Sequence, residues 1–202
     1  MTVADRDDLV VDGFGNTVTI VTDAPAFVLQ GASVTLENIV VNHAGNAAAI
    51  TLDNDSTLTV EEGAEITAKR TAIEMTGAAS KLVVNGGIFA TTDAAANDAI
   101  IRTASANVTI TDGIFTAADG SSVISIDKNA THKLIVNVMG GTFVAEDKLV
   151  EKVDAQGQII PGEYDTIEAI TFVNNCPTAI LVIDPDVLAA NPTLDVLNVA
   201  AQ

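Results

Sequence analysis

The residues that could carry catalytic or metal-binding chemistry are few and scattered along this chain of 202 residues. The two histidines, His43 and His132, lie far apart and have no partners at the spacing of a zinc site, so we expect both at the surface. Cys176 is the only cysteine, which excludes an intrachain disulfide. We expect it to be a small buried hydrophobic residue rather than a nucleophile. Because the sequence suggests no Ser-His-Asp or Cys-His arrangement, we predict no catalytic residue, no cofactor and no metal ligand.

One short segment, Asp53-Asn54-Asp55-Ser56, could offer several oxygen atoms to a calcium ion. It lacks the spacing of a known calcium loop, and Asn and Asp are also the residues that tight turns favour. We therefore interpret it as a turn, and calcium binding at Asp53 and Asp55 stays an open alternative.

Composition narrows the class of protein and of partner. The chain carries 27 acidic and nine basic residues, a formal net charge of −18, which disfavours nucleic acid and anionic membranes as partners. Aromatic residues make up only 3% and tryptophan is absent, so the core must consist of Val, Ile, Leu and Ala. The first ten residues lack the basic and apolar regions of a secretory leader, and no apolar run reaches 18 residues. We expect no leader and no membrane span.

The elements that must position these residues repeat along the chain. Three segments share an apolar pair, a glycine and then a phenylalanine, at Phe89, Phe115 and Phe143. Apolar residues recur at nearly the same period in two ladders, with spacings of 24 to 28 and of 23 to 27 residues. The first ladder consists of Val11, Leu36, Val60, Val84, Ile110 and Val138. The second ladder consists of Phe27, Ile50, Ile73, Ile100 and Ile124.

Each period reads as three short strands separated by turns. In the clearest copy the strands are 108–110, 114–116 and 123–126, with apolar residues at alternate positions and Asp, Asn and Gly between the strands. Glycine follows the first ladder by three residues in four copies, which indicates a left-handed corner between strands. Those glycines are Gly63, Gly87, Gly113 and Gly141. Leu36 departs from the rule, since Ile39 stands in the place of the glycine.

Together these patterns predict an all-β fold, a right-handed parallel β-helix (β-solenoid) of about six coils with a short distinct C-terminal β module. We expect residues 1–8 to form an N-terminal cap, 9–157 the β-helix and 158–202 the C-terminal segment. That segment holds four of the five prolines and three apolar runs, 170–173, 179–183 and 194–197, which we expect to be strands. It is either a cap or a docking and oligomerisation module. Residues 146–150 complete the sixth coil or begin a short helix, and we favour the coil.

The stack resembles the right-handed parallel β-helix family of pectin-degrading enzymes, bacterial surface adhesins and phage tailspikes. The resemblance covers residues 9–153 and rests on the strand–turn period and the Gly-x-Phe signature, which define a fold and not an activity. The motifs of the enzymes are missing. Asn16-Thr17 is followed by Val18 where polygalacturonases have aspartate, and His43 is not flanked by glycine. Arg70 and Arg102 could serve as a lyase base, but no acidic cluster accompanies them.

We therefore expect a non-enzymatic structural or interaction protein. The first hypothesis is a phage virion component at the virion surface, such as a head fibre, a decoration protein or a tail-associated β-helix. We expect a homo-oligomer, a trimer in preference, with other virion proteins or a glycan as partners. The alternatives are a fragment of a bacterial surface adhesin in the extracellular space and a polysaccharide lyase or hydrolase.

Overall fold

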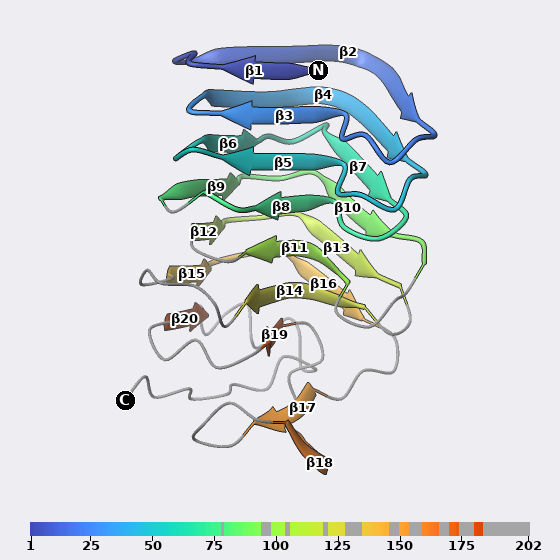
Figure 1. Ribbon diagram of the computed structural model, residues 1–202, viewed down its shortest axis with the longest axis vertical. Helices are drawn as coiled ribbons and strands as arrows, with labels where there is room; N and C mark the ends of the chain where they lie inside the picture. Colours follow the sequence, from blue (N-terminus) through green and yellow to red (C-terminus); the bar gives the residue numbers. More distant parts are fainter. Residues whose placement is uncertain are drawn as a thin grey trace.

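In a computed structural model of the chain, short strands are joined by turns, and the strands of successive coils lie side by side (Figure 1). The structure describes residues 1–77, 79–93, 98–103, 106–118, 121–127, 135–145, 150–153, 159–165, 170–173 and 180–183. These residues contain strands and turns, and the strands wind into a right-handed parallel β-solenoid (Figure 1). The predicted fold class is confirmed. Within the same residues, no helix is long and apolar enough to cross a bilayer.

Two parallel sheets make the solenoid. The first sheet has seven parallel strands that lie side by side along the stack. They are β1 (Thr2–Ala4), β3 (Phe27–Gln30), β5 (Ile50–Asp53), β8 (Ile73–Met75), β11 (Ala99–Thr103), β14 (Ser122–Asp127) and β19 (Ile170–Val173).

The second sheet has two halves, which share the long strands β2 (Leu9–Ile20) and β4 (Ser33–His43). From the third coil on, a corner divides each long strand into two short ones. One half continues through β6 (Thr57–Val60), β9 (Ser80–Val84), β12 (Ala106–Ile110), β15 (Ile135–Val138) and β20 (Ile180–Ile183). The other half continues through β7 (Glu65–Ala68), β10 (Ile88–Thr91), β13 (Ile114–Ala117) and β16 (Thr142–Ala145).

The first apolar ladder lies in register through six neighbouring strands, as the sequence predicts. Val11 pairs with Leu36, which pairs with Val60, and the same column continues downward. The lower pairs are Val60 with Val84, Val84 with Ile110 and Ile110 with Val138. The phenylalanine positions also pair in register, Phe89 with Phe115 and Phe115 with Phe143, and the rings of Phe89 and Phe115 stack in parallel at a centroid distance of 4.8 Å.

The second ladder is correct except at one position. Ile73 and Ile124 both pair with Ile101, so the predicted choice of Ile100 is wrong by one residue. Ile100 is also buried, but it lies on β11 one residue before the ladder position, and the backbone N–H of Ala72 donates to its carbonyl over 3.1 Å. Earlier coils have small residues one position before the ladder, Ala49 and Ala72, and the larger Ile100 therefore looked like the ladder residue.

The predicted left-handed corner is confirmed. Gly63, Gly87, Gly113 and Gly141 all have positive φ, between 84° and 130°. In the second coil the left-handed residue is Asn38, with φ 49°, and not Ile39. Asparagine tolerates this conformation better than other non-glycine residues, so the coil turns its corner without a glycine.

Near the ends of the chain, some strands extend the two parallel sheets and two others pair only with each other. Residues 1–8 include β1, which pairs with β3 and so belongs to the first coil. At the other end, β17 (Val150–Val153) and β18 (Ile159–Asp165) form an antiparallel pair, and β19 and β20 lie beside β14 and β15. Cys176, His132 and the expected strand 194–197 lie outside the described residues, as does 146–149.

Candidate functional site

A groove runs along the corner where the two halves of the second sheet meet. It has a volume of about 510 Å³ and crosses successive coils of the stack. We call it the glycine groove, because the corner glycines form much of its floor. It is lined by Glu62, Gly63, Ala64, Glu65, Asn85, Gly86, Gly87, Ile88, Asp112, Gly113, Ile114 and Thr142.

The floor of the groove is backbone because the coils approach too closely for side chains. A Cβ atom added to Gly87 would lie 2.7 Å from the carbonyl oxygen of Ala64 in the coil above. A Cβ atom added to Gly86 would lie 3.1 Å from the Cα of Glu62. The glycines thus keep the corner hollow, and the groove is a product of the repeat itself.

Two kinds of side chain line the groove. Ile88 and Ile114 are paired neighbours whose side chains point outward, and they are 43% and 47% exposed. The exposed residues Glu62, Glu65 and Asp112 line the same groove. No cationic side chain is among the described lining residues. The groove thus offers an apolar strip between hydrogen-bond acceptors, which suits ligands with hydroxyl or ammonium donors and repels polyanions.

Polar side chains next to the groove bind one another between coils. The Asn85 amide nitrogen donates to Glu61 Oε1 over 2.9 Å, and the Thr111 hydroxyl donates to Asn85 Oδ1 over 3.0 Å. These bonds fix the rim on one side of the corner, so a ligand would meet a preformed surface.

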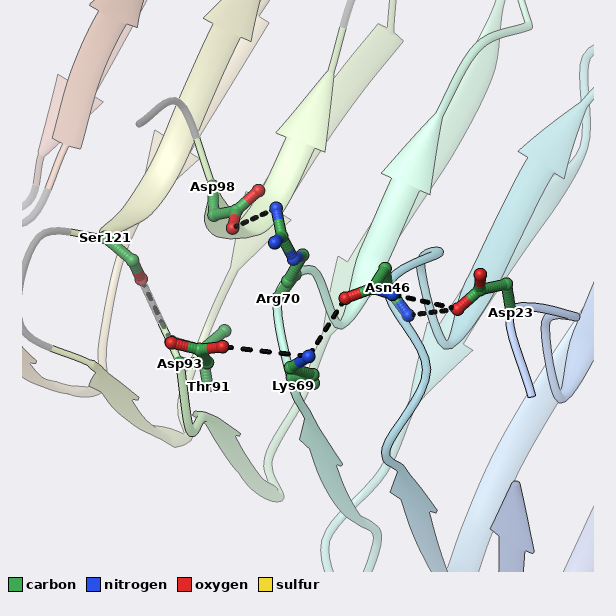
Figure 2. A network of polar contacts seen from close by, with 8 residues as sticks. All are labelled: Asp23, Asn46, Lys69, Arg70, Thr91, Asp93, Asp98 and Ser121. Carbon is green, nitrogen blue, oxygen red and sulfur yellow. Dashed lines mark hydrogen bonds and ion pairs between the residues drawn. The ribbon is translucent and has the colours of Figure 1, made fainter. Parts of the chain in front are cut away.

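A second polar cluster lies at another corner of the solenoid, where the second sheet leads into the first (Figure 2). Its members come from successive coils. Asp23 Oδ1 accepts the backbone N–H of Asn46 over 2.6 Å, and Lys69 Nζ donates to Asn46 Oδ1 over 3.0 Å. Lys69 also lies 3.8 Å from Asp93 Oδ2. These contacts join side chains of successive coils along one corner, and they stabilise the stacking of the coils.

Arg70 and Arg102, the two candidates for a lyase base, each form an ion pair. Arg70 Nη1 lies 3.6 Å from Asp98 Oδ2, and Asp98 is only 8% exposed (Figure 2). Arg102, on β11, pairs with Glu74 on the neighbouring strand β8. Each guanidinium would have to leave its carboxylate before it could act as a base, so the geometry suits cross-coil stabilisation better.

The expectation that His43 lies at the surface is wrong. It is 3% exposed, and its side chain occupies the last inward position of β4. The partner residue on β7 is Ala68, which leaves room for the imidazole, and His43 Nε2 lies 3.0 Å from the carbonyl oxygen of Ala24. The ring thus fills the core and satisfies one backbone group.

The segment Asp53-Asn54-Asp55-Ser56 is the turn that its composition predicts. Asn54 and Asp55 both have positive φ, 48° and 61°. The Ser56 hydroxyl donates to the Asp53 carbonyl over 2.5 Å, and Asp55 Oδ1 accepts the backbone N–H of Ala79 over 2.9 Å. Over the described residues, no group of three or more His, Cys, Asp or Glu side chains is placed to hold a metal ion.

The outward isoleucines of the glycine groove were not predicted from the sequence. The signal was present, because Ile88 and Ile114 each lie between a corner glycine and an inward phenylalanine. Alternation within a strand places them on the opposite face from that phenylalanine. An apolar residue at the same outward position of two coils indicates a surface strip.

Comparison of the chain with protein-family models, with curated proteins and with solved structures finds no match in any of the three.

Proposed function

We propose that the chain is a non-enzymatic binding protein that recognises a neutral glycan along the glycine groove. The observation that carries the proposal is the pairing of exposed Ile88 and Ile114 in a groove that Glu62, Glu65 and Asp112 also line. Sugar rings have apolar faces that can pack on aliphatic side chains, and their hydroxyl groups can donate to carboxylate and backbone acceptors.

The charge of the groove supports a neutral ligand over an acidic one. Glu62, Glu65 and Asp112 would repel the carboxylates of uronate polymers. Those polymers are the substrates that the lyase and hydrolase alternative requires, so the charge of the groove disfavours that alternative.

We further propose that the protein is a virion surface component and works as a homotrimer. A stack of parallel coils is a rigid shaft, and repeated outward positions give every copy of a trimer the same groove. Light scattering tests the oligomer on the full chain, for which a trimer should give three times the protomer mass of 20.7 kDa. Antibodies raised against the chain should label virus particles in electron microscopy, and labelling of cell envelopes instead would support the adhesin alternative.

The glycan proposal is tested by calorimetry with neutral and uronate oligosaccharides. We expect neutral oligosaccharides to bind, and the double change Ile88→Ala with Ile114→Ala to weaken binding about tenfold or more. Val21→Ala is the matched control, because Val21 is an exposed apolar residue outside the groove. Tighter binding of uronates, or release of reducing ends, would overturn the proposal.

A further inference from the structure

Within the described residues, no strand covers the first coil at the top of the solenoid. Among the described strands, β2 is hydrogen-bonded to β4 alone and β1 to β3 alone, so one edge of each strand has no neighbour (Figure 1). The inward residues of β2 are only partly buried, whereas their partners in β4 are at most 3% exposed. The core therefore reaches this end without a cover in the described part of the chain.

Exposed apolar side chains concentrate on this coil. Of the seven large hydrophobic residues that are exposed in the described chain, four lie within the first 21 residues. They are Met1, Val10, Phe14 and Val21. Exposed apolar groups gathered at an unpaired strand edge are typical of a surface that binds another chain.

Phe14 is the most unusual of these residues. It is 83% exposed and has φ 50°, a conformation that costs a bulky side chain energy. It lies in a bulge, because three residues separate Asp12 from Asn16 in β2 where a single residue separates their partners in β4. The Phe14 backbone N–H donates to Asp12 Oδ1 over 2.9 Å, and the Asn16 amide donates to the Gly13 carbonyl over 2.9 Å. The bulge is thus a built structure that presents an aromatic ring.

The backbone of β2 has free groups that face the open end. The N–H of Ala44 donates to the carbonyl of Ile20 over 2.8 Å, so the backbone groups of Ile20 face the second coil. Because backbone groups alternate in direction along a strand, those of Thr19 and Thr17 face away from it. An added strand could bind to them by β-augmentation.

The charge of the first coil favours one kind of binding partner. Residues 1–25 hold five acidic side chains, at positions 5, 7, 8, 12 and 23, and one basic side chain, Arg6. A second copy of this chain would bring the same acidic groups together at close range, and repulsion would oppose the contact. A strand with basic residues would instead be attracted to this end.

We propose that the first coil is a docking surface for a positively charged extended segment of another protein. The segment pairs with the outer edge of β2, and Phe14 packs against it as the anchor residue of the interface. This docking surface is independent of the glycine groove, which lies at the corner of the third to sixth coils.

The test uses the full chain and a synthetic ten-residue peptide of alternating Lys and Val, with a Glu and Val peptide as its control. We expect the basic peptide to bind and to slow hydrogen exchange at the amides of Thr17 and Thr19. Phe14→Ala should weaken binding about tenfold or more, and Thr19→Pro should abolish the exchange protection, because proline removes the outward N–H. Met139→Ala, at an exposed apolar residue outside both the first coil and the glycine groove, should leave binding unchanged.

Three results would overturn the proposal. Equal binding by the Phe14→Ala variant would exclude the anchor, and Phe14→Ala keeps the test valid even if Thr19→Pro fails to fold. Binding without protection at Thr17 and Thr19 would indicate a general attraction to the acidic surface. Concentration-dependent protection of β2 in the chain alone would show that a second copy is the occupant.

Discussion

At the scale of single residues, a comparison of two glycines distinguishes the free-energy cost of a positive φ from the cost of a steric clash. Gly87 has φ 100° and no room for a Cβ atom, whereas Gly15 has φ 75° and open space around it. Gly15→Ala should lower the free energy of unfolding by about 1 kcal/mol. Gly87→Ala should lower it by about 3 kcal/mol, because the clash with Ala64 adds to the conformational cost. Urea denaturation of the two variants measures the difference, and equal losses would mean that the coils can move apart.

The phenylalanine column allows a similar comparison between a buried and an exposed ring. Phe115 is fully buried and stacks on Phe89, whereas Phe14 is 83% exposed. Phe115→Ala should lower the free energy of unfolding by about 4 kcal/mol, because it leaves a cavity in the core. Phe14→Ala should change it by less than about 0.5 kcal/mol. Chemical denaturation followed by circular dichroism checks both values, and a large loss for Phe14→Ala would contradict its placement on the surface.

Single residues also show where sequence reasoning reaches its limit. The glycine spacing predicted a left-handed corner, and the four glycines have positive φ. The spacing could not indicate that Asn38 takes over this role in the second coil, because its position is one residue earlier. His43 was misplaced for a different reason. A polar residue at the end of a strand pattern indicates an outward face, and the small partner Ala68 that makes room for it comes from another coil.

At the scale of elements, the register of a parallel strand is set by its apolar residues when those alternate with polar ones. The first ladder was fully predictable because each member has a polar residue on at least one side. In β11 three consecutive residues, Ala99, Ile100 and Ile101, are all buried, so alternation gives no unique choice. The neighbouring strands β8 and β14 decide it, and their contribution is a tertiary one.

The corner contacts predict unequal roles for two adjacent cations at the end of β7. Lys69 binds exposed partners, and Lys69→Met should lower the free energy of unfolding by at most about 0.5 kcal/mol. Arg70 faces Asp98, which is 8% exposed. Arg70→Met should cost about 2 kcal/mol, because it removes the cation from a buried carboxylate.

Thermal unfolding of the Lys69→Met and Arg70→Met variants at equal ionic strength compares the two positions. The two substitutions remove the same charge, so they have the same effect on the net charge of the chain. A loss of equal size would show that Asp98 does not depend on Arg70, and that both cations act only through the overall charge.

At the scale of the whole molecule, the repeat predicts the stack of coils but not the surface that the stack creates. Outward positions vary between coils, and the angle between the two halves of the second sheet follows from packing of all the coils together. The glycine groove depends on that angle. The C-terminal segment has no period, so the antiparallel pair β17–β18 and the return of β19 and β20 to the two sheets rest on pairing between distant residues.

The net charge of −18 gives a prediction for the whole solenoid. Stacking places like charges on successive coils, and their repulsion opposes the folded state. Raising NaCl from about 10 mM to about 1 M shortens the Debye length from about 30 Å to about 3 Å, which screens this repulsion. A gain of about 2 kcal/mol would raise the Tm by about 4 to 8 °C.

Neutral substitutions in the glycine groove provide the control for this salt effect. Glu62→Gln, Glu65→Gln and Asp112→Asn together remove three of the negative charges and no described ion pair. This triple variant should have a higher Tm than the parent chain at low salt and a smaller gain on addition of NaCl, because less repulsion remains to be screened. Calorimetric scans at both salt concentrations measure the two gains. A Tm that falls with salt would instead mean that the attractive pairs, Lys69 with Asp93 and Arg70 with Asp98, outweigh the repulsion between coils.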